Sequence, residues 1–426
     1  MTVAILFLSL FLLLALRVPV AFALAGSSLL AIMYDGQVPE IVILHQMVGG
    51  VDSFPLLSVP FFVLAGAIMN SSGITHRIFD FANALVGWLR GGLGHVNVSA
   101  SIIFAGMSGA AVADAGGLGA IEIKAMRKRG YDADFSVGLT AASSTIGPII
   151  PPSLPLIIYG VMASASIGQL FAAGLIPGLL MAFALMIMVA WYAKKRQYPK
   201  EASLSLPNIA KTAKTAFLSL MTPVIIIFGI LLGIFTATEA AIAAAVYALF
   251  LGGIVYRSIS WRSLTKICMD TIETTSIIML IVGAAAAFSW VLTSQRVTED
   301  FTQWMLTLTN NKVIILLLIT LILFIVGCFM ETIAAITILT PILLPVAVSL
   351  GIDPVHFGIV MILNLMIGLL TPPVGLVLYV LSRVSNVPFE QCAKATLPFL
   401  VPLVIVLFLV IFIPQLSMWL PTMIYG

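Results

Sequence analysis

Charged residues are scarce in this sequence of 426 residues. Asp, Glu, Lys and Arg together make up 9% of the chain, whereas hydrophobic residues make up 61%. Soluble domains contain about 25% charged and roughly 45–50% apolar residues. This composition, with a mean hydropathy of +1.17, excludes a soluble globular protein. The net charge of +3 is confined to a few loops, so we expect no binding of nucleic acid.

Cysteine and histidine are also rare, with three and four residues respectively. Cys268, Cys328 and Cys392 lie far apart, which excludes a disulfide framework and a cysteine-based metal cluster. The histidines are scattered, and the sequence has no His–Glu zinc motif. An intramembrane enzyme that uses Asp114 and Glu331 as an acid pair is an alternative hypothesis that no spacing requires. We therefore expect no catalytic residues.

The chain has long apolar runs instead, for example at 3–16, 170–191 and 313–326. Because a spanning helix needs about 20 predominantly apolar residues, these runs predict roughly ten to twelve membrane crossings. The loops leave no room for a separate soluble catalytic domain. The sequence predicts an all-α polytopic membrane protein, with transport as its function.

The sequence repeats itself. IGPIIPPSLPLIIYG, which begins at Ile146, is similar to IGLLTPPVGLVLYVL, which begins at Ile367, and the shift is 367 − 146 = 221. The same shift pairs Gly106 with Gly327. We interpret residues 1–193 as a first repeat, 194–214 as a cytoplasmic linker and 215–426 as a second repeat.

The positive charges indicate that the two repeats have opposite orientations. Segment 124–130 carries four Lys and Arg residues, whereas its counterpart 345–351 carries none. Lys and Arg accumulate in cytoplasmic loops, so the two segments are expected on opposite sides of the membrane. Inverted repeats with helix breaks at matching positions are typical of secondary transporters.

Each repeat has a proline pair that should break a helix. Proline removes the hydrogen bond to the carbonyl four residues earlier, so Pro151 should free the carbonyl of Gly147 and Pro372 that of Gly368. Unwound backbone in transporters coordinates Na⁺. We predict two sodium sites, one at each break. The alternative is a structural kink in which a serine or a water molecule binds the carbonyl.

A second irregular element precedes each break. NVSASIIFAGMSGAAVADAGGLG begins at Asn97, and FIVGCFMETIAAITILTPILLPVA begins at Phe324. We interpret both as re-entrant helical hairpins whose tips face the breaks. Acidic residues at membrane depth are candidates for function, so Asp114 and Glu331 could face a substrate pocket or serve structure, whereas Glu239 fits a structural or capping role better.

Four stretches carry a resemblance to a known family. GMSGAAVADAGGLG, GPIIPPSLPLIIYG, FTATEAAIAAAVYAL and LLTPPVGLVLYV resemble the large membrane subunit of tripartite ATP-independent periplasmic (TRAP) transporters, nearly end to end. The resemblance implies a sodium-driven elevator, in which a transport domain carrying both hairpins and both broken helices moves past a scaffold. It also implies two protein partners, namely a small membrane subunit, expected as a separate chain, and a periplasmic substrate-binding protein.

The resemblance further implies the site residues, two or more coupling Na⁺ ions and a small organic anion as substrate. The implied sodium ligands are Gly106, Ser108, Gly147, Ile150 and Pro152 at the first site, and Gly327, Gly368, Thr371 and Val374 at the second. The implied substrate contacts are Ser108, Asp114, Ser153 and Glu331. Sialic acid is our preferred substrate, with four-carbon dicarboxylates and keto acids as the others. A stand-alone sodium/carboxylate symporter that needs no binding protein is the alternative function.

Overall fold

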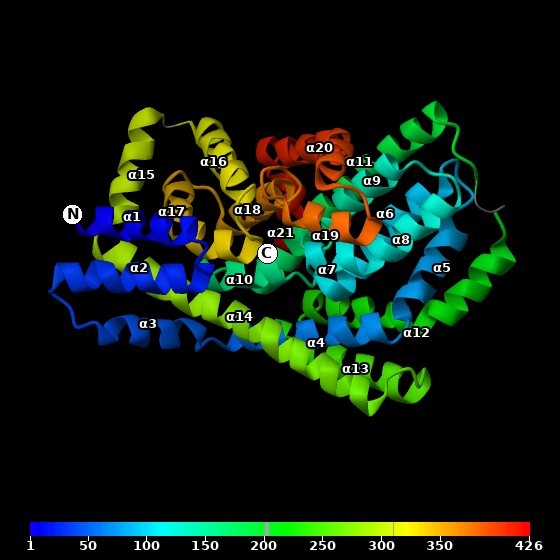
Figure 1. Cartoon of the computed structure of the whole chain (residues 1–426), viewed down its shortest axis with the longest axis horizontal. Coiled ribbons are helices and arrows are strands. Elements are labelled where there is room, and N and C mark those ends of the chain that lie inside the picture. Colours follow the sequence, from blue (N-terminus) through cyan, green and yellow to red (C-terminus); the bar gives the residue numbers. More distant parts are fainter. Residues whose placement is uncertain (201–203, 310) are drawn as a thin grey trace.

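The computed structural model describes residues 1–200, 204–309 and 311–426, and in this part of the chain every regular element is a helix. Figure 1 shows an elongated molecule with the N-terminus near one end of the long axis. The elements of the first half are α1 (Thr2–Ala15), α2 (Val20–Asp35), α3 (Ile41–Val51), the 3₁₀ helix η1 (Phe54–Leu57), α4 (Ser58–Ser71), α5 (Ile74–Val86), α6 (Gly92–Ser108), α7 (Ala111–Gly116), α8 (Leu118–Lys128), α9 (Ala133–Ser144), α10 (Leu154–Met162) and α11 (Ile167–Lys195).

The second half begins inside the segment predicted as a linker, because α12 already starts at Leu206. Its elements are α12 (Leu206–Leu231), α13 (Ala237–Phe250), the π-helical turn η2 (Leu251–Val255), α14 (Trp261–Ser294), α15 (Val297–Leu308), α16 (Lys312–Gly327), α17 (Thr332–Ser349), α18 (Pro354–Gly368), α19 (Leu376–Ser385), α20 (Phe389–Phe412) and α21 (Gln415–Tyr425).

The outer helices present apolar side chains to the surroundings. Within the described residues, seven helices are long and apolar enough to cross a membrane, and seven shorter apolar helices accompany them. Large hydrophobic side chains such as Leu8, Phe183 and Phe228 are more than half exposed on α1, α11 and α12. An exposed apolar surface of this extent fits contact with lipid, so the chain is a multi-pass membrane protein.

Helices α9 and α18 form the centre of the molecule. Every residue of α9 from Phe135 to Ser144, and every residue of α18 from Val355 to Gly368, is buried. A helix that is buried all round has no solvent or lipid face. Asp353 caps α18, because its Oδ1 accepts a hydrogen bond of 2.7 Å from the amide of Val355, and Pro354 occupies the first helical position, where a missing N–H costs nothing.

Both predicted helix breaks are confirmed. The first break comprises residues 145–153, between α9 and α10, and the second comprises residues 369–375, between α18 and α19. Each contains a cis peptide bond, at Pro151–Pro152 and at Pro372–Pro373.

Two helical hairpins precede the breaks, as predicted, but their arms are longer than the sequence indicated. Hairpin 1 consists of α6, α7 and α8, and hairpin 2 of α16 and α17. Helix α6 begins at Gly92 rather than near Asn97, and α16 begins at Lys312 rather than near Phe324. The 18 residues of α17 remain one helix despite Pro341 and Pro345 inside it, and this length corresponds to about 27 Å.

Several element bounds recur at the spacing of the sequence repeat. The first residues of α7 and α17 differ by this shift (332 − 111 = 221), as do those of α9 and α18 (354 − 133 = 221). Helix α14 departs from this pattern, because it is a continuous helix of 34 residues, whereas residues 40–73 form α3, η1 and α4. Pro55 lies in η1, where the missing N–H interrupts the helix, and Ser276 occupies the matching position in α14.

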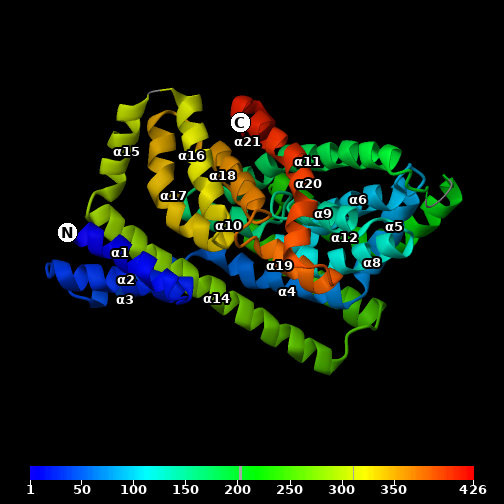
Figure 2. The ribbon, with the colours of Figure 1, turned by 45° about the horizontal axis from the view of Figure 1, so that its top comes forward.

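The hairpins and breaks lie among helices from both halves. Figure 2 shows α14 running along one side of the molecule, next to α1–α3 at one end. Helix α4 packs against α13 and α14, and α20 packs against α9. Hairpin 1 contacts α19 through α7 and α8, while α17 of hairpin 2 contacts α10. Each hairpin therefore touches the broken helix of the other half as well as its own.

Candidate functional site

The tip of hairpin 1 lies directly against the first break. Gly109 ends α6 in the left-handed region with a φ of 60°. A methyl group at this position would lie 2.5 Å from the carbonyl oxygen of Pro152 and 3.3 Å from Cα of Ser153. Only glycine has both the backbone freedom and the missing side chain that this approach requires.

The structure also brings Asp114 to the first break. The Asp114 side chain is 2% exposed, and a methyl group on Gly147 would overlap its carboxylate. The chain from Thr145 to Ile149 is a series of turns, and no hydrogen bond to the Gly147 carbonyl occurs among the described residues. A carboxylate implied as a substrate contact and an unbonded carbonyl implied as a sodium ligand are thus neighbours at the first break.

Hairpin 2 meets the second break through backbone contact. A methyl group on Gly368 would lie 2.6 Å from both Cα and the carbonyl carbon of Gly327. The amide of Val374 donates a hydrogen bond of 3.2 Å to the carbonyl of Cys328, the residue after Gly327. Gly327, Gly368 and Val374 are therefore brought together, and the fourth residue implied for a second sodium site, Thr371, lies in the same break.

The prediction that Pro372 leaves the Gly368 carbonyl unbonded is wrong. The amide of Thr371 donates a hydrogen bond of 2.9 Å to that carbonyl, and the Thr371 hydroxyl donates to the carbonyl of Ile367 at 3.0 Å. The end of α18 tightens into an i→i+3 turn, which is a common way for a helix end to satisfy its last carbonyls. The two breaks thus differ, because only the Gly147 carbonyl lacks a hydrogen bond within the described chain.

Two of the implied substrate residues cap helices. Ser153 is fully buried, donates to the carbonyl of Pro148 and accepts a hydrogen bond of 3.2 Å from the amide of Leu156 at the start of α10. The Glu331 carboxylate accepts hydrogen bonds from two amides at the start of α17, one of 2.8 Å from Ile333 and one of 3.2 Å from Ala334. Both side chains hold the helix ends next to the breaks and so fix the shape of the site.

The remaining predicted ligands are placed less directly. A methyl group on Gly106 would lie 2.5 Å from Cβ of Pro223 on α12, so this face of the glycine points to α12. Ile150 contacts Gly178 of α11 through its side chain, and its amide donates to the carbonyl of Ile146 at 3.0 Å. Ser108 is the last residue of α6, and its side chain lies outside the described part of the structure.

The structural role predicted for Glu239 is confirmed. Its carboxylate accepts a hydrogen bond of 2.8 Å from the amide of Thr236, and the Thr236 hydroxyl accepts one of 3.3 Å from the amide of Glu239. The two residues form a capping box at the start of α13.

Sequence reasoning missed one buried acid, Glu122 on α8, which is 1% exposed. It forms a polar cluster with Asn97, Thr140 and Ser143, all of them buried. Lys124 follows Glu122 two residues later, so the local sequence indicates a positively charged loop there and not a buried acid. The position of Glu122 eight residues after Asp114 in the same apolar hairpin is the signal that could have identified it.

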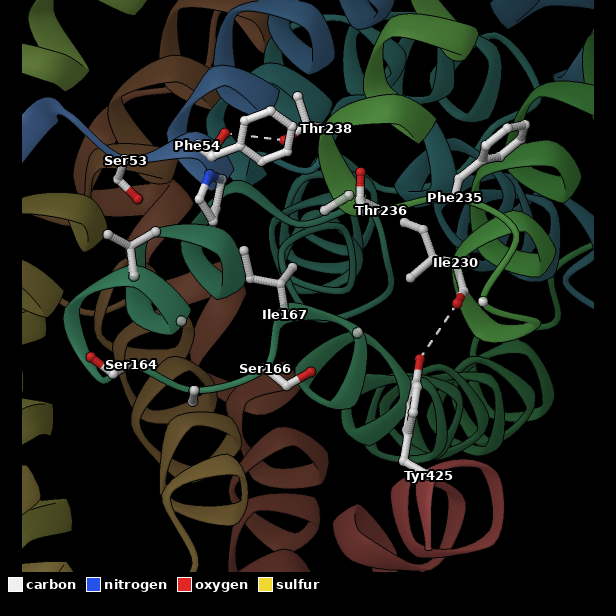
Figure 3. A pocket seen from close by; sticks show the side chains of 17 residues that line it. Ser53, Phe54, Ser164, Ser166, Ile167, Ile230, Phe235, Thr236, Thr238 and Tyr425 are labelled. Atoms are coloured by element: carbon white, nitrogen blue, oxygen red, sulfur yellow. Dashed lines mark hydrogen bonds between the residues drawn. The ribbon is translucent and has the colours of Figure 1, made fainter.

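A cavity lies away from these residues. It has a volume of about 640 Å³ and is lined by η1, the loop from α10 to α11, the loop from α12 to α13, and Tyr425. Figure 3 shows the Tyr425 hydroxyl pointing toward the carbonyl of Ile230 across this cavity, at 3.5 Å. None of the predicted site residues lines it. It lies at the far end of α10 from the first break, about one short helix away, or roughly 13 Å.

Metal ligation by side chains has no support in the described residues, because no three His, Cys, Asp or Glu side chains come together there. A cation at the breaks would depend chiefly on backbone and hydroxyl oxygens, with the Asp114 carboxylate beside them at the first break. Oxygen ligands suit Na⁺ as a hard cation.

Comparison with known proteins connects this geometry to transport. Residues 7–416 match the family described as the DctM component of tripartite ATP-independent periplasmic transporters. The chain is 50% identical over 408 residues to the sialic acid TRAP transporter large permease protein SiaM of Vibrio cholerae, covering 96% of each chain. It is 40% identical over 370 residues to the C4-dicarboxylate TRAP transporter large permease protein DctM of Pseudomonas aeruginosa, covering 87% of each.

A solved structure has a similar fold. The chain is similar to MtrF of Neisseria gonorrhoeae, described as illuminating a class of antimetabolite efflux pumps, with a TM-score of 0.64 and 14% identity. The match covers 89% of this chain and 84% of MtrF. At this level of identity the similarity concerns the fold alone.

Proposed function

The chain belongs to the DctM-component family of tripartite ATP-independent periplasmic transporters, and we propose that it imports a small organic anion using a sodium gradient. Like its relatives, the chain is a large permease and not an enzyme. The observation that carries the proposal is the contact of each hairpin with a helix break, at Gly109–Pro152 and at Gly327–Gly368. Irregular backbone at membrane depth is tolerated where it lines a site.

Sodium coupling is supported most strongly at the first break. The unbonded Gly147 carbonyl lies beside the Asp114 carboxylate. Burial of a carbonyl without a hydrogen-bond partner in an apolar environment is unfavourable by a free energy on the order of 2–7 kcal/mol. A bound Na⁺ would remove this cost. At the second break, Na⁺ would use the remaining lone pair of the Gly368 carbonyl, because a carbonyl oxygen has two.

Sialic acid is the substrate that we propose. It is the substrate in the name of the Vibrio cholerae relative, which is more similar to this chain than the C4-dicarboxylate relative is, at 50% against 40% identity. Asp114, Ser153, Glu331 and Ser108 stay our proposed substrate contacts.

We also propose the assembly and the mechanism. The family name implies a tripartite system, so a small membrane subunit and a periplasmic binding protein are the expected partners in the bacterial inner membrane. The helix bounds that recur at the spacing of the sequence repeat support two repeats, and the reversal of positive charge supports their inversion. In the elevator that we propose, the hairpins and broken helices move together past helices such as α12 and α14.

Uptake in proteoliposomes tests this function. The chain with its small subunit would be reconstituted under an inward sodium gradient, and candidate binding proteins loaded with sialic acid or a dicarboxylate would be added one at a time. We expect uptake only with sodium, binding protein and matched substrate together. Full-rate uptake with choline in place of sodium would refute the coupling, and uptake by the chain alone would favour the stand-alone symporter.

A further inference from the structure

A closed polar cluster ties hairpin 1 to the first broken helix. Asn97 lies on α6, Glu122 on α8, and Thr140 and Ser143 on α9. All four side chains are at most 1% exposed. Both long arms of the hairpin and the broken helix therefore meet at one buried set of hydrogen bonds.

The distances within the cluster are short. The Asn97 amide group lies 2.6 Å from Glu122 Oε2 and 2.8 Å from Thr140 Oγ1 on one side, and 2.7 Å from Ser143 Oγ on the other. If Nδ2 faces Glu122 and Thr140, the Thr140 hydroxyl hydrogen has no acceptor among the described residues, and Glu122 Oε1 has no partner there either.

A charged Glu122 has poor compensation in this environment. Its only hydrogen-bond donor in the described chain is the Asn97 amide, and it makes no ion pair there. Burial of an ionised carboxylate without a cation is strongly unfavourable.

The opposite orientation of the Asn97 amide gives the Thr140 hydroxyl hydrogen an acceptor and lets a protonated Glu122 donate to Asn97, while Glu122 Oε1 accepts no hydrogen bond from the described residues in either orientation. Amide nitrogen and oxygen occupy equivalent positions, so the hydrogen-bond network decides the orientation. With Oδ1 facing Glu122, the distance of 2.6 Å fits an O–H···O hydrogen bond better than an N–H···O one. Thr140 then donates to Asn97 Oδ1, Asn97 Nδ2 donates to Ser143, and Ser143 donates to the Thr140 carbonyl at 3.3 Å.

We propose that Glu122 is an uncharged carboxylic acid that donates a hydrogen bond to Asn97, and that this neutral cluster positions hairpin 1 so that Asp114 lies against the first break. Glu122 is a positioning residue, since Asp114 and Gly147 are the groups at the site itself. The functional part of this inference rests on the proposed sodium-driven transport. A neutral Glu122 adds no charge to a unit that moves across the membrane potential, where every carried charge adds electrical work.

The cluster belongs to hairpin 1 and its broken helix alone. The shift of the sequence repeat replaces its members by Leu318, Leu343, Met361 and Asn364, of which only Asn364, the counterpart of Ser143, is polar. Hairpin 2 therefore has apolar side chains where hairpin 1 has Asn97 and Glu122. Other titratable residues on α8 and on the elements that pack against it are His95, Asp114, Lys124, Arg127, Lys128, Asp134, Tyr379 and Arg383.

Infrared difference spectroscopy tests the protonation state without transport. The spectrum of the purified chain minus that of Glu122→Gln should contain the C=O stretch of a protonated carboxylic acid at neutral and mildly alkaline pH. A difference spectrum that contains only carboxylate bands would overturn the proposal. This readout does not depend on sodium coupling, so its outcome is separate from that of the proposed function.

Uptake and sodium titration test the positioning role. Glu122→Gln keeps a donor for Asn97. The sodium concentration for half-maximal uptake should therefore change by no more than about twofold, and the pH dependence of uptake should stay the same. Glu122→Leu, which copies hairpin 2, removes the hydrogen bond between Glu122 and Asn97 and should raise the sodium concentration for half-maximal uptake by roughly tenfold. Ser143→Ala should act in the same direction.

Ser136→Ala is the matched control, because Ser136 is an equally buried hydroxyl on α9 that bonds only the carbonyl of Asp132. Expression, assembly and melting temperature in the absence of sodium would be measured for every variant. An inactive but assembled Glu122→Gln protein would mean that the charge is needed, which contradicts the proposal. A Glu122→Leu protein with unchanged sodium titration would exclude the positioning role. Uptake by the unmodified protein that does not depend on sodium would refute only the proposed function.

Discussion

Replacement of Gly368 by alanine tests the second break most directly. The new methyl group would lie 2.6 Å from Cα and from the carbonyl carbon of Gly327, and 3.1 Å from the Gly327 carbonyl oxygen. All three atoms belong to the backbone, so no side-chain rotation can relieve the overlap. Hairpin 2 must move away from the break, and the oxygen atoms proposed to bind the second sodium ion must separate.

The expected magnitude follows from the packing. Insertion of a methyl group into a well-packed core costs about 1–3 kcal/mol. If this cost falls on the closed, sodium-bound arrangement, the apparent sodium affinity should decrease roughly 5- to 140-fold, since 1.4 kcal/mol corresponds to a factor of ten. Gly327→Ala should have a smaller effect, because its methyl group would lie 3.2 Å from the Gly368 Cα.

Sodium titration of uptake in proteoliposomes would measure these changes. Gly49→Ala on α3 is the control, because a methyl group there meets nothing within 4 Å. Binding to the small subunit and melting temperature without sodium would identify a variant that simply misfolds. If a folded, assembled Gly368→Ala protein gave the sodium titration of the unmodified protein, the contact between hairpin 2 and the break would have no part in ion binding.

Three further predictions concern other parts of the molecule. Gly147→Ala should displace the Asp114 carboxylate and reduce substrate uptake, and uptake kinetics with unchanged KM and maximal rate would contradict this. A cysteine at Lys128 should react only with cytoplasmic reagents and one at Ser349 only with periplasmic reagents, whereas labelling from a single side would refute the inverted repeats. Arg196→Gln should lower the free energy of unfolding by about 1 kcal/mol, because Arg196 bonds both Asp132 and Asp134 at 2.8 Å. The hydrogen bond from Arg196 lowers the pKa of Asp134 below its ordinary value of 3.8. The stabilisation should therefore be present at pH values above 3.8 and disappear as the pH falls below that value. Melting curves at several pH values would check this.

The proline pairs made the breaks predictable, because proline cannot continue the hydrogen bonds of a helix whatever surrounds it. The capping role of Glu239 was equally local, since Thr236 lies three residues before it. The hydrogen bond from Thr371 to Gly368 was not predictable in this way, because it depends on how tightly the last turn of α18 closes. Such a turn is set by the packing of α16 and α17 around it, which sequence spacing does not reveal.

The contacts of Glu122 were also not predictable from sequence spacing. Its partner Asn97 is 25 residues away along the chain, and Ser143, which bonds Asn97 in turn, belongs to a third helix. Only the folded hairpin brings these side chains together. In the sequence, Glu122 lies close to positively charged residues such as Lys124. In the folded chain, it lies in a cluster with the uncharged side chains of Asn97 and Thr140.

The two halves share a plan of helices but divide the chemistry between them. The first break offers an unbonded carbonyl beside a buried acid, held by a hydrogen-bonded cluster. The second break has its Gly368 carbonyl already bonded, and backbone contact with Gly327 holds it against hairpin 2. A cation at the first break would bind an oxygen that accepts no hydrogen bond from the described chain, whereas one at the second would share an oxygen that already has a partner. A substrate anion between the hairpins would therefore meet unequal neighbours, with the acidic side chain of Asp114 on one side and the capped helix start at Glu331 on the other. In the pocket that we propose between the two halves, this inequality would make the two sides chemically different, unlike those of a symmetric pocket.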